Sequence, residues 1–375
     1  MPNQVIGEAT LLHEFVFMLE ILQPMGTWRE GHRRMNTNSQ PATSRDIARL
    51  AKVSQATVSR VLSGHPSVQP ETRDRVLAAV RQLNYRPNGM ARAMRTNRTG
   101  NIGVVVSRLA NPLYPQMLQI LGQHLAEAGL RMMVWSTSEA DEMNALSAAR
   151  ESLVDGIIMT TATTNSSQLY DALKLNVPVV LINRVVEGWP CDQLSSDNYD
   201  GGRQVADYLV KAGRRRLGLI GGPAVASTIR DRLAGFRDGL ASLGVALDPG
   251  CCVDAPMFSH QNGFAAASAL LDLADAPDAI FCVNDVLALG ACDAARTRGL
   301  NVPNDFWLVG YDDIEMSAWP AFDLTTVRQP LTRMTADAVS LLQDRITGVM
   351  REHSIKVLPN DLMVRGSTAG FRPAA

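Results

Sequence analysis

The stretch that decides the fold is TSRDIARLAKVSQATVSRVL, residues 43–62, whose pattern predicts two short helices joined by a tight turn. Thr43 is followed three residues later by Asp46, which is the spacing of a capping box at the start of a helix. The apolar positions after this box fall on one side of a helix: Ile47, Leu50 and Ala51. The first helix is therefore expected to begin after Thr43 and to pack through this stripe.

The second predicted helix, residues 55–62, has two unlike faces. Ser54 stands just before it and is an N-cap candidate. The face expected to be buried carries Val58, Val61 and Leu62. The opposite face carries small or polar side chains: Gln55, Ala56, Ser59 and Arg60. Such side chains suit a recognition helix that enters the major groove of DNA, although an ordinary amphipathic helical hairpin shows the same pattern.

A third helix is predicted within residues 68–87, VQPETRDRVLAAVRQLNYRP, with Pro70 in its first turn. Its expected core positions are Val76, Val80 and Leu83. The three helices, the NYRPN turn and the following MARAMRTNRTGNIGVVV resemble the head of regulators of the lactose-repressor (LacI/GalR-type) family. The resemblance covers nearly everything from Gln40 to about residue 370.

The resemblance implies which head residues contact DNA. Gln55, Ala56 and Arg60 match the base-reading positions, and their chemistry suits adenine, the thymine methyl group and guanine, respectively. Contacts to phosphates position the protein without reading sequence. The candidates for such contacts are Ser44, Thr57, Ser59 and Asn88, and Ser54 belongs to the same DNA-binding set.

Residues 88–100 are predicted to be a hinge after a helix-turn-helix domain of residues 41–87. An isolated peptide this short should be largely unfolded in water. The resemblance implies that two hinge helices pair in a dimer and enter the minor groove, where Met94 replaces a wedging leucine. Arg92 and Arg95 would then lie near phosphates. A plain flexible linker is the alternative.

Residues 1–40 are assigned no function. They are expected to be an unstructured tail, or to precede a true start at Met35, and a short amphipathic helix is the alternative. The apolar stretch of residues 11–22 is too short to span a bilayer, and the features of a signal peptide are missing. We therefore expect no membrane partner and a cytoplasmic protein, associated with the nucleoid when bound to DNA.

Composition and charge agree with a globular chain that has a basic head. Apolar residues make up 46% and charged residues 19% of the 375 residues. From Met35 to Gly100, eleven basic residues face three acidic ones, a net charge of +8, whereas the whole chain carries −1. This split predicts a polyanionic partner for the head. The five cysteines and six histidines show no zinc-ligand spacing, so no metal is expected and the thiols should be reduced.

The body, residues 101–372, alternates apolar strands with helices, which predicts parallel sheets covered on both faces. The strand candidates are residues 102–106, 132–135, 156–159, 179–182, 217–220, 279–283 and 307–309. The helix candidates are residues 112–128, 199–211, 228–243, 263–273, 286–298 and 331–346. The strands divide after Asn183, giving two doubly wound lobes, and the last helix is expected to cover the first lobe. The resemblance implies a periplasmic-binding-protein-like module, with a crossover between lobes at residues 318–326.

An effector pocket is expected at the carboxyl ends of these strands. Arginine, asparagine and aspartate side chains that meet there can bind adjacent hydroxyl groups or a carboxylate. The resemblance implies effector contacts from Leu113, Tyr114, Asn183, Arg232, Phe258, Asn284 and Asp312. The family often has aspartate at the position of Asn183, which leaves the effector's identity open.

Alternatives exist for several of these residues. Arg232 could be a surface helix residue. Asn284 could cap the next helix, and Asp285 is expected to be mainly structural. Asp313 is interpreted as a turn or capping residue. Trp319 could border the pocket, but core packing is the favoured role.

The sequence therefore predicts an all-α helix-turn-helix head on a two-lobed α/β body, working as a homodimer. The predicted function is sequence-specific binding to a near-palindromic operator in double-stranded DNA, controlled by a small-molecule effector such as a sugar or sugar derivative. The alternative is a ligand-binding protein whose head does not read DNA. No cofactor is expected, because Gly221-Gly222 lacks the G-x-G-x-x-G spacing. Enzymatic activity is not expected either, since Asp312 is the one plausible base and has no evident partner.

Overall fold

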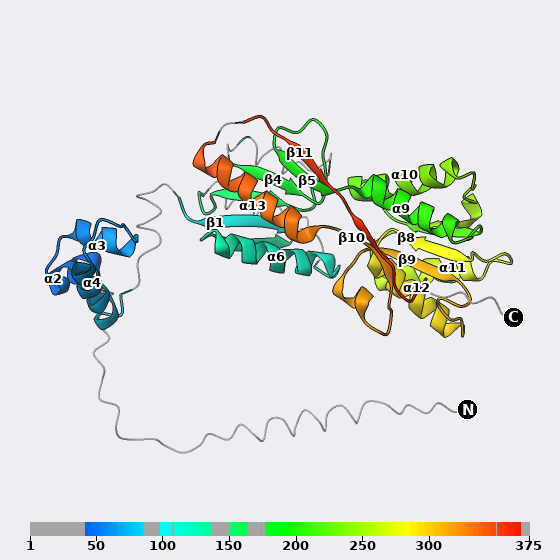
Figure 1. Ribbon diagram of the computed structural model, residues 1–375, viewed down its shortest axis with the longest axis horizontal. Coiled ribbons are helices and arrows are strands. Elements are labelled where there is room, and N and C mark those ends of the chain that lie inside the picture. The colour runs from blue at the N-terminus through cyan, green and yellow to red at the C-terminus, as the bar shows by residue number, and fades with distance from the viewer. Residues whose placement is uncertain are drawn as a thin grey trace, which may run out of the picture. The chain divides into compact units, whose positions relative to one another are not determined.

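The computed structural model describes residues 42–85, 98–106, 109–136, 151–163, 174, 177–349 and 351–368. These residues form two compact units that divide between Asn88 and Gly89. We call residues 42–85 the head and residues 98–368 the body (Figure 1). The predictions for residues 1–40 and for most of the hinge lie outside the described residues.

The head consists of helices α2 (Ser44–Ala51), α3 (Gln55–Leu62) and α4 (Pro70–Gln82). The capping box is confirmed, because the Asp46 carboxylate accepts hydrogen bonds from the Thr43 backbone N–H (2.9 Å) and hydroxyl (2.7 Å). The second cap is also confirmed, since the Ser54 hydroxyl oxygen accepts from the Thr57 N–H at 3.1 Å. These caps satisfy backbone N–H groups that a helix leaves unpaired at its start.

The small core of the head contains side chains from all three helices: Ile47, Ala48, Ala51, Val58, Val61, Val76 and Ala79. Leu62, Val80 and Leu83 are half-buried against it. The prediction that Leu50 packs inward was wrong, because its side chain is 42% exposed. The buried stripe of α2 is centred on Ile47 and includes Ala48, so the helix is rotated away from Leu50.

The first lobe of the body is built on a six-stranded sheet in the order β11-β5-β4-β3-β1-β2. Its strands are β1 (Asn101–Val106), β2 (Arg131–Ser136), β3 (Gly156–Met159), β4 (Val179–Ile182), β5 (Asp192–Ser196) and β11 (Ile355–Leu358). All its pairs are parallel. Helices α6 (Leu113–Glu127) and α13 (Leu331–Thr347) pack together on this lobe, so the expected position of the last helix is confirmed (Figure 1).

The second lobe has a six-stranded sheet in the order β12-β10-β9-β8-β6-β7. Its strands are β6 (Leu217–Gly221), β7 (Cys252–Asp254), β8 (Ala279–Cys282), β9 (Trp307–Asp312), β10 (Thr325–Arg328) and β12 (Asp361–Met363). The helices are α9 (Asn198–Lys211), α10 (Ser227–Ser242), α11 (His260–Leu271) and α12 (Asp285–Thr297), with short 3₁₀ turns η1 (Pro249–Cys251) and η2 (Glu315–Ala318). α9 and α10 cover one face and α11 and α12 the other, while β12 runs antiparallel to β10 (Figure 1).

The chain passes between the lobes three times: after β5, between β10 and α13, and between β11 and β12. The predicted division after Asn183 was therefore one strand too early, because β5 still pairs with β4 in the first sheet. The predicted crossover at residues 318–326 was also misplaced. That segment ends in β10 of the second sheet, and the chain crosses at Gln329 and Pro330.

Candidate functional site

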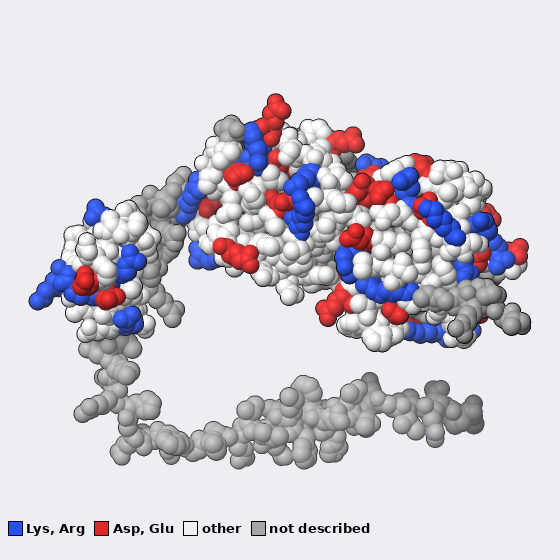
Figure 2. Space-filling view, in the orientation of Figure 1, with Lys and Arg blue, Asp and Glu red and all other residues white. Residues whose placement is uncertain are grey.

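The outward face of α3 is the candidate DNA-reading surface of the head. Gln55, Ala56 and Arg60 are exposed, and Ser59 is half-buried. The Gln55 side-chain amide donates to the Ser44 hydroxyl at 3.1 Å, so one predicted base-reading group lies against one predicted phosphate contact. Basic side chains stand out on the head in Figure 2, where only a few acidic groups accompany them. The further candidates lie outside the described residues: Asn88, Arg92, Met94 and Arg95.

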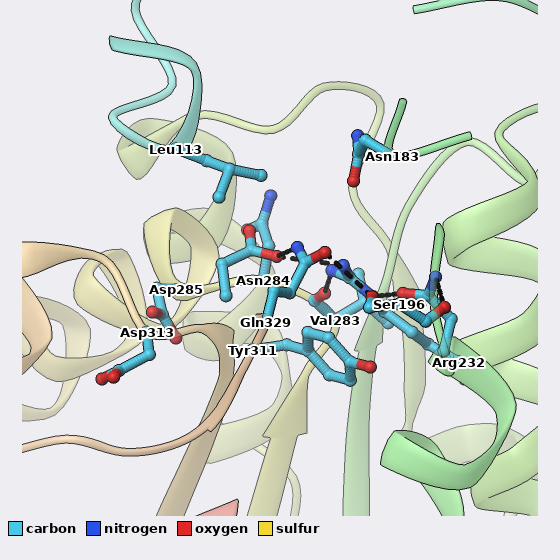
Figure 3. Close-up of polar contacts among 12 residues, drawn as sticks. Leu113, Asn183, Ser196, Arg232, Val283, Asn284, Asp285, Tyr311, Asp313 and Gln329 are labelled. Carbon is cyan, nitrogen blue, oxygen red and sulfur yellow. Dashed lines mark hydrogen bonds and ion pairs between the residues drawn. The ribbon is translucent and has the colours of Figure 1, made fainter. Parts of the chain in front are cut away.

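In the body, the predicted Arg232 and Asp312 form a buried ion pair. Arg232 Nη2 lies 3.0 Å from Asp312 Oδ1, and both side chains are 3% exposed. The other guanidinium nitrogens are also satisfied, because Nε donates to Asn198 Oδ1 (2.8 Å) and Nη1 to the Val283 carbonyl (2.7 Å) (Figure 3). The guanidinium carbon lies 3.6 Å from the centre of the Tyr311 ring. The alternative that Arg232 is a surface residue is thus excluded.

Asp312 is held in an unusual backbone conformation at the end of β9, with φ of 116°. Such a conformation is costly for a residue with a side chain and is maintained only when its surroundings impose it. Here the imposed contacts are those to Arg232 and to Gln329, whose amide donates to Asp312 Oδ1 at 2.7 Å. Burial raises the pKa of Asp312, while the Arg232 charge and the Gln329 hydrogen bond oppose that rise.

Asn183 brings an unsatisfied hydrogen-bond acceptor to this region. It follows β4, adopts a left-handed conformation (φ 76°) and is 3% exposed. Its side-chain oxygen has no hydrogen-bond partner, and Figure 3 shows that oxygen directed toward the group around Gln329 and Arg232. A buried polar atom without a partner is energetically costly, so this oxygen is ready for a donor supplied by a ligand.

Asn284 has the capping role considered from the sequence, because its Oδ1 accepts from the Leu287 N–H at 3.0 Å at the start of α12. The remaining predicted pocket residues are more dispersed. Leu113 extends toward the site from the start of α6 (Figure 3), and Tyr114 beside it is buried. Phe258 is half-buried against Gly222, where an added Cβ would lie 2.3 Å from its ring. Gly222 therefore makes room for this ring.

A cavity of about 380 Å³ opens between the lobes next to Asp312. α6 contributes Gln116 and Ile120 from the first lobe. The other lining residues are Asp312, Asp313 and the segment from Arg328 to Arg333. This volume lies within the usual range for small-molecule sites.

Several side chains near the cavity serve the structure. Asp285 is completely buried, and its carboxylate accepts hydrogen bonds from the Ile314 N–H (2.9 Å), the Ser317 hydroxyl (2.8 Å) and the Thr326 hydroxyl (2.6 Å). Its predicted structural role is therefore confirmed. Burial and the nearby negative Asp312 outweigh these hydrogen bonds and raise the pKa of Asp285 to about 7.

Asp313 has the left-handed backbone of a turn residue (φ 53°), and in addition it forms ion pairs with Arg328 (2.5 Å) and Arg365 (2.6 Å). One interpretation made from the sequence needs correction. Trp319 does not pack in the core, since 47% of it is exposed. It follows the 3₁₀ turn η2 at the surface, where the chain turns back toward β10.

The sequence reasoning missed Gln329, Ser196 and Asn198. All three are buried polar residues, and they lie where the chain passes from one lobe to the other. Polar residues next to short strands were the available signal, but only the two-lobed path of the chain brings them to Arg232 and Asp312. Among the described residues no cluster of metal-ligating side chains occurs, and no helix there is long and apolar enough to cross a membrane.

An exposed recognition-type helix on a basic head, followed by a two-lobed body with a cavity between its lobes, defines the class of ligand-controlled DNA-binding regulators. Residues 43–88 match the model of bacterial regulatory proteins of the lacI family, and residues 206–368 match that of the periplasmic binding protein-like domain.

Among curated proteins, the chain is 32% identical to the HTH-type transcriptional repressor PurR of Haemophilus influenzae (strain PittEE), over 87% of this chain and 98% of that protein. It is 37% identical to an uncharacterized HTH-type transcriptional regulator of Streptomyces limosus, over 89% of this chain and 97% of that protein.

Solved structures give the same result. The lac repressor dimer bound to operator and the anti-inducer ONPF superposes with a TM-score of 0.76, at 28% identity over 88% of this chain and all of that one. A complex of the transcriptional regulator CelR with cellobiose superposes with a TM-score of 0.67, at 31% identity over 87% of this chain and 99% of that one. The chain belongs to the lacI family of bacterial regulatory proteins, which are DNA-binding transcriptional regulators and not enzymes.

Proposed function

We propose that the protein represses transcription as a homodimer whose two α3 helices read the half-sites of a near-palindromic operator. The exposed side chains of Gln55, Ala56 and Arg60 support this role, because they combine hydrogen-bonding groups and a methyl group on one helix face. Two-fold symmetry of a dimer would then be matched by the symmetry of the operator. Such a protein works in the cytoplasm, bound to the nucleoid.

The effector we propose is an uncharged, polyhydroxylated molecule, in particular a neutral sugar. The observation that carries this proposal is the buried Arg232–Asp312 pair, which balances its own charge at 3.0 Å and leaves no net charge for an anionic ligand. Asp313 is engaged by two arginines, so its carboxylate is not free to bind a ligand cation. The partnerless oxygen of Asn183 requires a donor, and a sugar hydroxyl is a suitable one.

Operator selection from a pool of randomised duplexes tests the DNA-reading part of this proposal. We compare the wild type with Arg60→Ala and with Arg81→Ala, an equally charged change at an exposed position of α4. The wild type should recover a near-palindrome. Arg60→Ala should lose discrimination at one base pair in each half-site, worth about 1–3 kcal/mol, while Arg81→Ala should weaken binding evenly across sequences.

Recovery of the same preference by Arg60→Ala would contradict the assignment of α3 as the reading helix. Failure of the wild type to select any sequence would favour the alternative, a ligand-binding protein whose head does not read DNA.

A further inference from the structure

Helix α13 is held by polar contacts at both ends, and the two ends lie at different parts of the body. Its first residue, Leu331, follows the crossover residues Gln329 and Pro330 beside the cavity. Its last turn reaches residues 98–100, which we call the hinge exit because the chain enters β1 there. A helix of 17 residues spans about 25 Å, so α13 connects two distant places.

At the cavity end, Gln329 joins the effector site to two crossovers. Its side-chain nitrogen donates to Asp312 Oδ1 at 2.7 Å, and its side-chain oxygen accepts from the Ser196 hydroxyl at 2.9 Å (Figure 3). Gln329 is 3% exposed, so water does not compete for these bonds. A ligand that draws the Asp312 carboxylate toward itself must therefore pull on Gln329 or break its bond.

The middle of α13 packs closely on the first lobe. Its buried side chains are Leu331, Met334, Thr335, Ala338, Val339 and Leu342. At Gly156, the first residue of β3, an added Cβ would lie 2.9 Å from Leu342 Cδ1 and 3.3 Å from Ile346 Cδ1. Because close-packed interiors transmit strain, a shift of the helix would be felt at Gly156.

The residue before Gly156 holds the hinge exit. The Asp155 carboxylate accepts hydrogen bonds from the Thr99 N–H (2.7 Å), the Thr99 hydroxyl (2.9 Å) and the Gly100 N–H (2.8 Å). In addition, Arg98 Nη2 donates to the Ile346 carbonyl in the last turn of α13 at 2.6 Å. The hinge exit is thus attached both to α13 and to the strand on which α13 packs.

We propose that α13 is a relay that carries the state of Asp312 to the hinge exit, with Gln329 as its positioning residue at the cavity and Arg98 and Asp155 as its attachment at the hinge. This inference rests on the proposed function, since it gives the regulation of the same effector site. When Asp312 changes partners, Gln329 and the start of α13 move. The movement of the helix changes the hydrogen bonds that hold residues 98–100. The segment predicted as the hinge, residues 88–100, ends at those residues.

Hydrogen exchange of the full chain, measured by mass spectrometry without DNA or effector, tests the relay. Gln329→Met keeps the length of the side chain and removes both hydrogen bonds. The amides of Thr99 and Gly100 should then exchange about threefold to tenfold faster than in the wild type. The matched control is Ser367→Ala, which removes two buried hydrogen bonds of the second lobe, to the Thr325 N–H and the Leu308 carbonyl, and does not touch the crossover to α13.

The control should leave exchange at the hinge exit within about twofold of the wild type. Equal acceleration in both variants would mean general loosening of the body and would overturn the relay, as would unchanged exchange in Gln329→Met. Should that variant not fold, Ser196→Ala removes one of the two bonds, and absence of any acceleration there overturns the relay too. Because no DNA is used, failure to select an operator would refute the proposed function separately.

Discussion

Replacing Arg232 by methionine leaves the Asp312 carboxylate buried without its cation. The two groups are 3.0 Å apart and almost inaccessible to water. Breaking a buried pair by removing one partner typically destabilises a protein by about 3–5 kcal/mol, because the remaining charge is uncompensated. Two further hydrogen bonds of Arg232 are also lost, those to Asn198 and to the Val283 carbonyl. We therefore expect a loss in the upper part of this range.

The loss should depend on pH in a defined direction. Arg232 lowers the pKa of Asp312, which burial already raises above its ordinary value. Without Arg232 the pKa rises further, so the folded variant binds a proton that the unfolded chain has released. Its stability is then lost as pH rises through the folded-state pKa, with a slope of up to about 1.4 kcal/mol per pH unit. The difference from the wild type should accordingly grow as pH rises above the ordinary pKa of an aspartate and level off above the raised folded-state pKa.

Urea unfolding at pH 6, 7 and 8, followed by tryptophan fluorescence, measures this effect. Four of the five tryptophans report on the body, at positions 135, 189, 307 and 319. The double variant Arg232→Met/Asp312→Asn is the control, since it removes the orphaned charge and should recover part of the stability and abolish the extra pH dependence. A loss below about 1 kcal/mol that does not change with pH would refute the reasoning.

Three other changes have defined outcomes. Burial raises the pKa of Asp285 to about 7. Between about pH 4 and 7 the folded protein therefore holds a proton that the unfolded chain has lost. The free energy of unfolding of the body should fall as pH rises through that window. Asp285→Asn should reduce the slope of unfolding free energy against pH by the contribution of one proton, at most about 1.4 kcal/mol per pH unit. An unchanged slope in urea titrations would contradict the raised pKa of Asp285. Asn183→Gly removes the partnerless oxygen and retains the left-handed backbone. The melting temperature should stay within a few degrees of the wild type, while the effect of neutral sugars on operator binding disappears. If that effect remained, Asn183 would not be part of the effector site. Ser54→Ala should destabilise the head by about 1 kcal/mol in circular dichroism melts, and no change would show that this cap is dispensable.

Sequence reasoning located most elements of the fold because their signals are local. The caps at Thr43 and Ser54 and the strands of residues 156–159 and 179–182 were found at the observed places. It missed β5, DQLSS, which lacks the apolar run of a buried strand. Gln193 tolerates burial there because its side-chain amide makes two hydrogen bonds with the Val186 backbone, at 2.8 and 2.9 Å. β10, TTVR, was missed for a similar reason, since Thr326 is buried against Asp285.

The candidate site was partly accessible from the sequence. Arg232 and Asp312 were singled out separately, and the structure brings them into one ion pair. Gln329 could not be foreseen, because its role depends on the chain returning from β10 to the first lobe at that residue. The exposure of Trp319 could not be foreseen either, since aromatic residues are usually buried and the turn around it is irregular.

The most direct test of a DNA-binding regulator controlled by a neutral sugar is a footprint of the purified full-length protein on genomic DNA from its own source. The footprint is made at one fixed salt concentration, because affinity for DNA depends strongly on salt. Metabolite extract, separated by ion exchange into neutral and anionic fractions, is added to parallel samples. We expect discrete near-palindromic sites whose occupancy changes about fivefold or more with the neutral fraction alone. Absence of discrete sites, or a change caused only by the anionic fraction, would contradict the account.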